Sequence, residues 1–293
     1  MKWRLLRTGY NTGAFNMAVD EAILRCHARG KVPPTFRLYG WRPPALSLGR
    51  LQSFYREVDP EACRRLGIDV VRRPTGGRAV LHDMEVTYSF IVSESNPLIP
   101  KDLGASFSIA TSGIVKGLGL LGVTARIQGG RRVGHPGSQR EAARDCRPAG
   151  CRPASGQSAA CFDTPSWYEV VAGDGRKLVG SAQARIAGVL LQHGSILLDL
   201  DVEKLVSVFR FADPGERDRV AAELREKATS LSELLGRPVG FKEAYDAVAW
   251  GVREYFHDIE VDFEDGQLTP EELALAGELE ATKYATDAWT AQR

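Results

Sequence analysis

A cysteine and a lysine lie sixteen positions apart in the second half of the chain, on either side of a Gly-Asp-Gly turn at 173–175. A thiol attacks only as the thiolate, and a nearby ammonium group stabilises that anion by direct charge attraction. Cys161 and Lys177 are therefore predicted to be a catalytic pair, with the sulfur as the nucleophile of an acyl transfer. The alternative is that Cys161 is packed in the core, as most cysteines are.

A glycine loop lies earlier in the chain, in the run Arg-Arg-Pro-Thr-Gly-Gly-Arg that begins at Arg72. Two adjacent glycines let backbone N–H groups approach a ligand closely, and arginines flank the pair. A β-type run follows and ends at His82-Asp83. The alternative interpretation is an ordinary hairpin turn. The residues predicted to bind substrate here are Arg73, Thr75, Gly76, Gly77 and His82.

Two later β-type runs carry further candidates, at 180–183 and 192–195. Small residues on a strand allow a ligand or another backbone to approach closely. The residues predicted to bind substrate here are Gly180, Ser181, Gln183 and His193. Two alternatives stay open: the Gly-Ser pair marks close packing only, and His82 and His193 are hydrogen-bonded structural residues.

No metal and no cofactor is predicted. Cys146, Cys151 and Cys161 do not form the spacing of a structural zinc site, and only His135 lies near them in the sequence. The chain also has no Walker-type loop, no dinucleotide fingerprint after a first strand and no Gly-x-Ser-x-Gly elbow.

The composition is that of an ordinary globular protein of 293 residues, with 43% hydrophobic and 26% charged side chains. The formal net charge of +1 gives no reason to expect binding to nucleic acid or to a membrane. The cysteines are odd in number, five, and the first residues form no long apolar segment. These features favour reduced thiols and a cytoplasmic location.

Helix and strand patterns predict an α+β fold, with mixed, mostly antiparallel sheets packed against helices. The predicted strands cover 35–41, 45–49, 68–73, 79–81, 85–92, 168–172, 177–186 and 188–199. The predicted helices cover 16–28, 60–66, 103–121, 202–209, 214–227, 230–235 and 241–256, and a last one begins at Thr269-Pro270 with a capping box. In the first helix, Asn16 is expected to be the N-cap, with Asp20 and Glu21 near the first turns.

The segment 129–158 differs in composition from its surroundings, because it is rich in Arg, Gly, Pro and Ser and has no apolar periodicity. It is predicted to be a long, mobile basic loop. Two interpretations stay open: a solvated insertion without function, or a lid that meets an acidic partner.

Taken together, the runs 72–83, 180–183 and 192–195 resemble the biotin/lipoate protein ligase superfamily, and 16–21 and 46–52 are similar to its opening segments. The resemblance extends from about residue 10 to the end. Within the superfamily, the segment 160–169 resembles the cysteine segment of the LipM-type octanoyltransferases. Lys283-Tyr284 with Trp289 is similar to the end of that group, whereas the stretch before Cys161 is longer than the family pattern requires.

The resemblance implies a biotin/lipoate ligase-like catalytic domain over 1–256 and a short helical extension over 257–293. It implies an acyltransferase of lipoate biosynthesis and protein lipoylation that needs no cofactor. Octanoyl-acyl carrier protein would be the donor, Cys161 would carry a thioester intermediate, and the glycine cleavage H protein or another lipoyl domain would be the acceptor. Lys177 would hold the thiolate, and the acyl chain would lie between the loop at Gly76 and the strand at Gly180.

Three alternatives to this activity stay open. The first is an amidotransferase that moves octanoyl from the H protein to other lipoyl domains. The second is an ATP-dependent lipoate–protein ligase, and the third is an inactive acyl-binding protein.

Overall fold

The structure, a computed structural model, describes residues 1–129 and 169–293. Nearly all of the predicted basic loop at 129–158 lies outside the described residues, and so do Cys146, Cys151 and Cys161.

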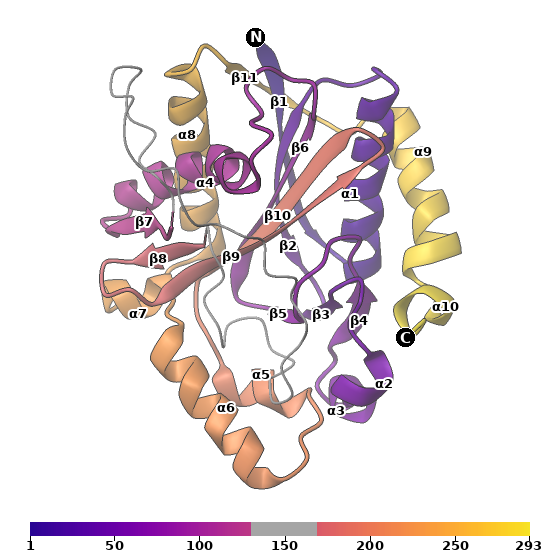
Figure 1. Cartoon of the computed structure of the whole chain (residues 1–293), viewed down its shortest axis with the longest axis vertical. Coiled ribbons are helices and arrows are strands. Elements are labelled where there is room, and N and C mark those ends of the chain that lie inside the picture. The colour runs from indigo at the N-terminus through magenta and orange to yellow at the C-terminus, as the bar shows by residue number, and fades with distance from the viewer. Residues whose placement is uncertain (130–168) are drawn as a thin grey trace, which may run out of the picture.

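Eight strands of the described residues form a central sheet in the order β11-β1-β2-β6-β10-β9-β8-β7 (Figure 1). The strands β11, β1 and β2 run parallel, and every other neighbouring pair is antiparallel. Their bounds are β1 Lys2–Asn11, β2 Thr35–Trp41, β6 Glu85–Ser93, β7 Ala125–Ile127, β8 Val170–Ala172, β9 Lys177–Ile186, β10 Val189–Leu197 and β11 Asp262–Gly266. The predicted fold of mixed, mostly antiparallel sheets is confirmed, and the Gly-Asp-Gly turn does join the antiparallel pair β8–β9.

Helices cover both faces of this sheet. On one face α4 (Leu103–Leu120) and α8 (Phe241–His257) pack on Val86, Tyr88 and Phe90 of β6. On the other face lie α1 (Gly13–Ala28) and α9 (Pro270–Leu279). Because side chains alternate along a strand, Thr87 and Ser89 point to the α1 face. That face therefore carries the small polar side chains of β6, whereas the α4 face carries its valine and aromatic side chains.

By length and composition alone, α4 is apolar enough to cross a membrane, and it is the one such helix in the described ranges. In the structure it packs against α8 and contributes to the largest apolar core. A buried core helix passes the same test of composition.

A second sheet of three strands has the order β4-β3-β5, with β3 at Ala45–Leu48, β4 at Asp69–Arg72 and β5 at Val80–His82. It packs with α3 (Pro60–Arg65), α5 (Val202–Ser207) and α6 (Pro214–Lys227) around a smaller core. The strands β4 and β5 pair with β3 and not with each other. The hairpin interpretation of the Gly-Gly turn is therefore wrong, because the loop between these strands crosses over the end of β3.

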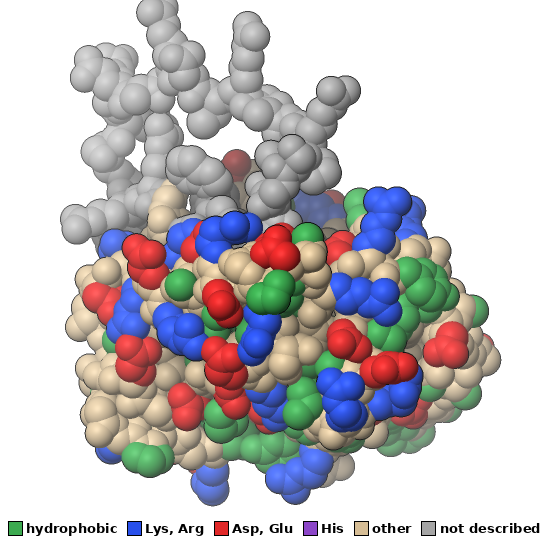
Figure 2. Space-filling model, turned by 90° about the horizontal axis from the view of Figure 1, so that it is seen from below, with side chains coloured by type: hydrophobic (Ala, Val, Ile, Leu, Met, Phe, Trp, Pro, Cys, Tyr) green, Lys and Arg blue, Asp and Glu red, His purple; other side chains and the backbone are tan. Residues whose placement is uncertain are grey.

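The outer surface near this smaller sheet carries charges of both signs. Figure 2 shows acidic and basic side chains interspersed over the face seen from below in Figure 1. On α6, Arg217 and Arg225 both reach Glu203 of α5, and Lys227 pairs with Glu223. Among the residues that the structure describes, such mixed pairs produce no single-sign field on this face.

The first helix begins earlier than predicted. Thr12 is its N-cap and accepts a hydrogen bond from Phe15 N at 3.2 Å. The prediction of Asn16 as the cap is wrong, because Asn16 is buried inside the helix and donates to Gly40 O at 2.9 Å. Asp20 and Glu21 consequently lie in the middle of α1, away from its first turn.

Three strands of the main sheet, β1, β7 and β11, are not among the predicted ones. In β1 and β11 charged residues break the alternation: Arg4 of β1 is buried and pairs with Glu272 of α9 at 2.5 Å. The segment after residue 256 therefore contributes a strand and a helix to the main fold, and the division of the chain at 256 stays a prediction.

The remaining elements are short: α2 (Phe54–Glu57), α7 (Leu231–Leu235), the π-helix η1 (Glu280–Tyr284) and α10 (Asp287–Thr290). The last of these is tied to β4 by Arg72, whose guanidinium donates to Trp289 O and Thr290 O. The same guanidinium donates to Gly49 O and Gln52 O, both at 2.8 Å. The end of the described chain is thus anchored at the base of the glycine loop.

Candidate active site

The glycine loop, residues 73–78, lies directly against the end of β3. Arg50 N donates to Thr75 O at 2.8 Å. A Cβ atom built on Gly49 would lie only 1.8 Å from Gly77 O, so the two backbone segments touch. Gly77 itself has a φ of 92°, which favours glycine. Gly76 and Gly77 are exposed, whereas Thr75 is buried.

Substitution of Gly49 tests this close approach. We expect Gly49→Ala to destabilise the protein by roughly 1–3 kcal/mol, because the methyl group cannot fit without displacing the loop. Gly76→Ala is the matched control, since a Cβ there meets nothing within 4 Å and Gly76 has no positive φ. Thermal unfolding of both variants gives the comparison; equal melting temperatures would contradict the observed contact.

Arg73 holds the loop from inside. Its Nη2 donates to Gly76 O at 2.8 Å and to Arg78 O at 2.7 Å, and its Nη1 donates to Ser47 O at 2.9 Å. Ser47 Oγ lies 2.7 Å from His82 Nε2, and His82 Nδ1 lies 2.7 Å from Glu85 Oε1. The loop carbonyls are thereby connected to β3, β5 and β6 through buried polar groups.

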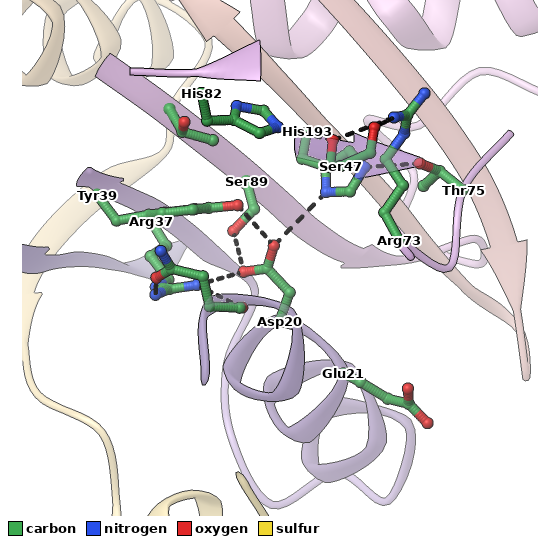
Figure 3. Close-up of polar contacts among 12 residues, drawn as sticks. Asp20, Glu21, Arg37, Tyr39, Ser47, Arg73, Thr75, His82, Ser89 and His193 are labelled. Atoms are coloured by element: carbon green, nitrogen blue, oxygen red, sulfur yellow. Dashed lines mark hydrogen bonds and ion pairs between the residues drawn. The ribbon is translucent and has the colours of Figure 1, made fainter. Parts of the chain in front are cut away.

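Thr75 is held by a second buried histidine (Figure 3). Thr75 Oγ1 lies 2.6 Å from His193 Nε2, and His193 Nδ1 lies 3.6 Å from Asp20 Oδ2. Burial lowers the pKa of His193 and outweighs the opposite effect of Asp20. Burial would raise the pKa of Asp20, but the charge of Arg37 and the contacts with His193 and Ser89 leave it lowered. At neutral pH His193 is therefore a neutral imidazole that lies between the carboxylate of Asp20 and the hydroxyl of Thr75.

These shifts predict that stability is lost on acidification. Below about pH 6.5 the unfolded chain protonates its histidines, while burial opposes protonation of His193 in the folded protein. The unfolded state then binds more protons, so the free energy of unfolding falls as the pH falls. Asp20 extends this loss of stability to lower pH, because folding lowers the pKa of its carboxyl group. We expect the melting temperature to fall between pH 7 and 5, less steeply in His193→Gln.

The exposed His257 is the control for this measurement. The hydrogen bond to Asp262 raises the pKa of His257, the opposite direction. His257→Gln should therefore still show the fall in melting temperature between pH 7 and 5. A melting temperature independent of pH in the wild-type protein would contradict the neutral, buried His193.

Ser181 and Gln183 lie on the opposite face of the sheet, towards α4. Gln183 Nε2 donates to Gln192 Oε1 at 2.9 Å, and Ser181 Oγ lies 2.7 Å from the hydroxyl of Tyr88. Gln192 Nε2 in turn donates to Tyr88 at 2.7 Å, and burial raises the pKa of Tyr88 to about 12. Ser181 and Gln183 thus join a neutral network of their own, separated from His193 by the sheet.

Gly180 lies on the His193 face of this pair of strands. It pairs with Ser195, and the next residue on its face, Ala182, pairs with His193. Both residues have minimal side chains. The glycine loop reaches the neighbouring strand β10 at the contact of Thr75 with His193, and the close approach predicted for Gly180 stays a prediction.

Lys177 is the first residue of β9, and its side chain lies beside that of Glu169. Both residues are buried, with side-chain exposures of 1% and 5%, and Lys177 Nζ lies 2.5 Å from Glu169 Oε1. The β8–β9 pairing shifts register between Val170 and Val171, which faces Lys177. Such irregularities re-aim side chains next to functional sites. Lysine is almost never fully buried unless it is paired, as it is here.

Two residues of this arrangement were not among the sequence candidates, Glu169 and Asp20. Glu169 lies within the run 160–169 that carries the family resemblance, but nothing in the sequence pairs it with Lys177. For the described candidates, the structure brings Arg73, Thr75, His82 and His193 together. It separates Ser181 and Gln183 from them by the thickness of the sheet.

Comparison with known proteins agrees with this architecture. The sequence model of the lipoyl protein ligase A/B catalytic domain matches residues 12–252. A solved bi-partite lipoate protein ligase from Thermoplasma acidophilum, described with its E2 lipoyl domain, superposes with a TM-score of 0.76. That match is 26% identical and covers 99% of this chain and 96% of that one. The chain therefore belongs to the lipoyl protein ligase A/B catalytic-domain family, and the predicted fold family is confirmed.

Closer relatives narrow the class. Over 287 residues the chain is 50% identical to an octanoyltransferase LipM of Kyrpidia tusciae, covering 98% of this chain and 97% of the relative. Over 291 residues it is 40% identical to an octanoyltransferase LipM of Bacillus subtilis, covering 99% and 98%. Within the family it groups with the LipM-type octanoyltransferases, and its activity is octanoyl transfer in lipoate biosynthesis. The predicted enzyme class is confirmed.

Proposed function

We propose that this octanoyltransferase takes its acyl group from octanoyl-acyl carrier protein and passes it through Cys161 to a lysine of the glycine cleavage H protein or another lipoyl domain. The thiolate attacks the thioester carbonyl, and the carrier thiol leaves with a proton. The acceptor amine then attacks the octanoyl-enzyme, loses a proton and releases the Cys161 thiolate as the amide forms. Exchange of a thioester for an amide is downhill, so the reaction consumes no ATP.

The observation that carries this proposal is the buried ion pair between Lys177 and Glu169. Glu169 follows Cys161 by eight residues in the sequence and is itself paired with the lysine. An ammonium fixed in a low-dielectric site attracts an anion far more strongly than one in water. Lys177 is therefore suited to stabilise the thiolate and to relay a proton between the leaving thiol and the incoming amine. Charged groups held in such environments cluster at functional sites.

The glycine loop supplies candidate donors for the oxyanion. Over the described part of the chain, no hydrogen bond uses the N–H of Gly76 or of Gly77, and both residues are exposed. Preorganised backbone donors of this kind stabilise the charge that develops on an attacked carbonyl. Roles in substrate binding for the loop residues, His82, His193, Gly180, Ser181 and Gln183 stay predictions.

We place the acyl chain between the loop and the small residues Gly180 and Ala182. Burial of six methylenes would contribute on the order of 5 kcal/mol, at about 0.8 kcal/mol each. That contribution is large enough for chain length to select the substrate.

The donor and acceptor are tested by a direct reconstitution. The purified protein is mixed with octanoyl-acyl carrier protein and apo H protein, without ATP, and the H protein is analysed by mass spectrometry. We expect octanoylated H protein. Parallel reactions contain either free octanoate with ATP, followed by pyrophosphate release, or octanoyl-H protein with a second lipoyl domain. Product only with ATP would identify a ligase, and product only from octanoyl-H protein would identify an amidotransferase.

A further inference from the structure

We propose that Asp20, a buried residue of α1, is a positioning residue for the glycine loop and acts through His193 and Thr75. This proposal rests on the proposed function, because it assigns the loop a part in acyl transfer. It adds Asp20 to the residues that shape the site and gives Thr75 and His193 a role other than contact with the acyl chain.

The three side chains form a continuous buried connection from α1 to the loop (Figure 3). Asp20 Oδ2 faces His193 Nδ1 at 3.6 Å, and His193 Nε2 faces Thr75 Oγ1 at 2.6 Å. Asp20 and Thr75 are fully buried, and His193 is 5% exposed. Within a connection closed to water, displacement of one group leaves its neighbour without a solvent substitute, which is costly.

The carboxylate of Asp20 is fixed from three further sides. Arg37 Nη1 donates to Oδ1 at 2.7 Å and Ser89 Oγ donates to the same oxygen at 2.8 Å. Tyr39 donates to Oδ2 at 3.0 Å. Arg37 and Tyr39 belong to β2 and Ser89 to β6, so the position of the carboxylate is set by the central sheet.

The chemistry gives the connection a direction. A carboxylate facing Nδ1 favours the proton on that nitrogen, so Nε2 keeps its lone pair and accepts from the hydroxyl of Thr75. Thr75 is then held by its side chain at His193 and by its carbonyl at Arg50 N. The backbone that leads into Gly76 is thereby fixed at two points one residue before the exposed N–H groups.

The order acid, histidine, hydroxyl is also the order of a hydrolytic triad. A triad requires a hydroxyl that the substrate can reach, whereas Thr75 has no exposed surface. The geometry therefore favours positioning over nucleophilic attack by Thr75.

The experiment compares Thr75→Val, which removes the hydroxyl at constant shape, with Thr75→Ser, which keeps it. Asp20→Asn tests the far end of the connection. Thr111→Val removes another fully buried threonine hydroxyl, one that bonds Phe107 O within α4. Each variant is assayed for acyl-enzyme formation in a single turnover and for amide hydrogen exchange in peptides covering 73–80 and 86–93.

We expect Thr75→Val and Asp20→Asn to slow acyl-enzyme formation by roughly tenfold, the effect of one lost buried hydrogen bond. Exchange should rise in 73–80 and stay unchanged in 86–93. Thr75→Ser should remain within about twofold of wild type because it keeps the hydroxyl, and so should Thr111→Val, because its hydroxyl bonds within α4 and not with the loop.

Wild-type rates and exchange in Thr75→Val would overturn the proposal. So would a change in KM alone with unchanged loop exchange, which indicates direct substrate contact, or an octanoyl group found on Thr75. If Asp20→Asn fails to fold, Thr75→Val still decides. Absence of any acyl-enzyme in the wild-type protein would instead contradict the proposed function. Amide exchange in 73–80 would still show whether Asp20 and Thr75 fix the loop.

Discussion

Cys161→Ala should abolish octanoyl transfer, with a loss of about four orders of magnitude or more in turnover. Removal of a nucleophile eliminates the covalent route, and what remains is only the effect of binding and oxyanion donors. Cys161→Ser should be nearly as inactive, because a hydroxyl is far less ionised than a thiol beside the same lysine. The measurement is transfer from octanoyl-acyl carrier protein to H protein, followed by mass spectrometry.

Two other cysteines provide matched controls. Cys26 and Cys63 are free and buried, and burial raises the pKa of Cys63 to about 11. Burial likewise raises the pKa of Cys26. Cys26→Ala and Cys63→Ala should keep full transfer with a small loss of stability. Full turnover by Cys161→Ala would refute the thioester route.

Lys177→Ala should have two large effects. The first is the loss of thiolate reactivity, seen as slow alkylation of Cys161. The second is destabilisation by about 3–5 kcal/mol, because the buried carboxylate of Glu169 loses its ion pair with the ammonium. Alkylation kinetics and thermal unfolding measure the two effects separately.

A double variant separates structure from chemistry. Lys177→Met with Glu169→Gln removes both buried charges, and replacement of a buried pair by neutral residues is often close to neutral for stability. We expect the double variant to regain most of the melting temperature and none of the transfer activity. Recovery of transfer would mean that the ion pair serves the fold alone.

The parts of the fold that could be predicted are those in which the pattern is local. The strand at 85–93 alternates, and its two faces do meet different helices. The Gly-Asp-Gly turn joins β8 to β9. Gly175 has a φ of 89° there, a value that favours glycine. These signals need no partner from elsewhere in the chain.

The parts that could not be predicted depend on distant partners. β1 contains Arg4, whose buried charge is paired by Glu272 from a distant part of the chain. The glycine loop crosses over β3, because β3 lies between β4 and β5 in the sheet. No local turn signal in the sequence predicts this strand order.

The candidate site shows the same limit. Glycines, histidines and the lysine were identifiable from their types and their neighbours in the sequence. Asp20 and Glu169 were missed because their roles arise from contacts with His193 and Lys177. One signal for Asp20 was available: an acid flanked by Val19, Ala22 and Ile23 in a helix, all buried, needs a buried partner.

The most direct test of the account is the mass of the wild-type enzyme after brief exposure to octanoyl-acyl carrier protein without an acceptor. We predict one added octanoyl group, mapped by peptide sequencing to Cys161, labile to hydroxylamine and discharged when apo H protein is added. An unmodified protein that nevertheless octanoylates H protein, or a group attached to any other residue, would contradict it.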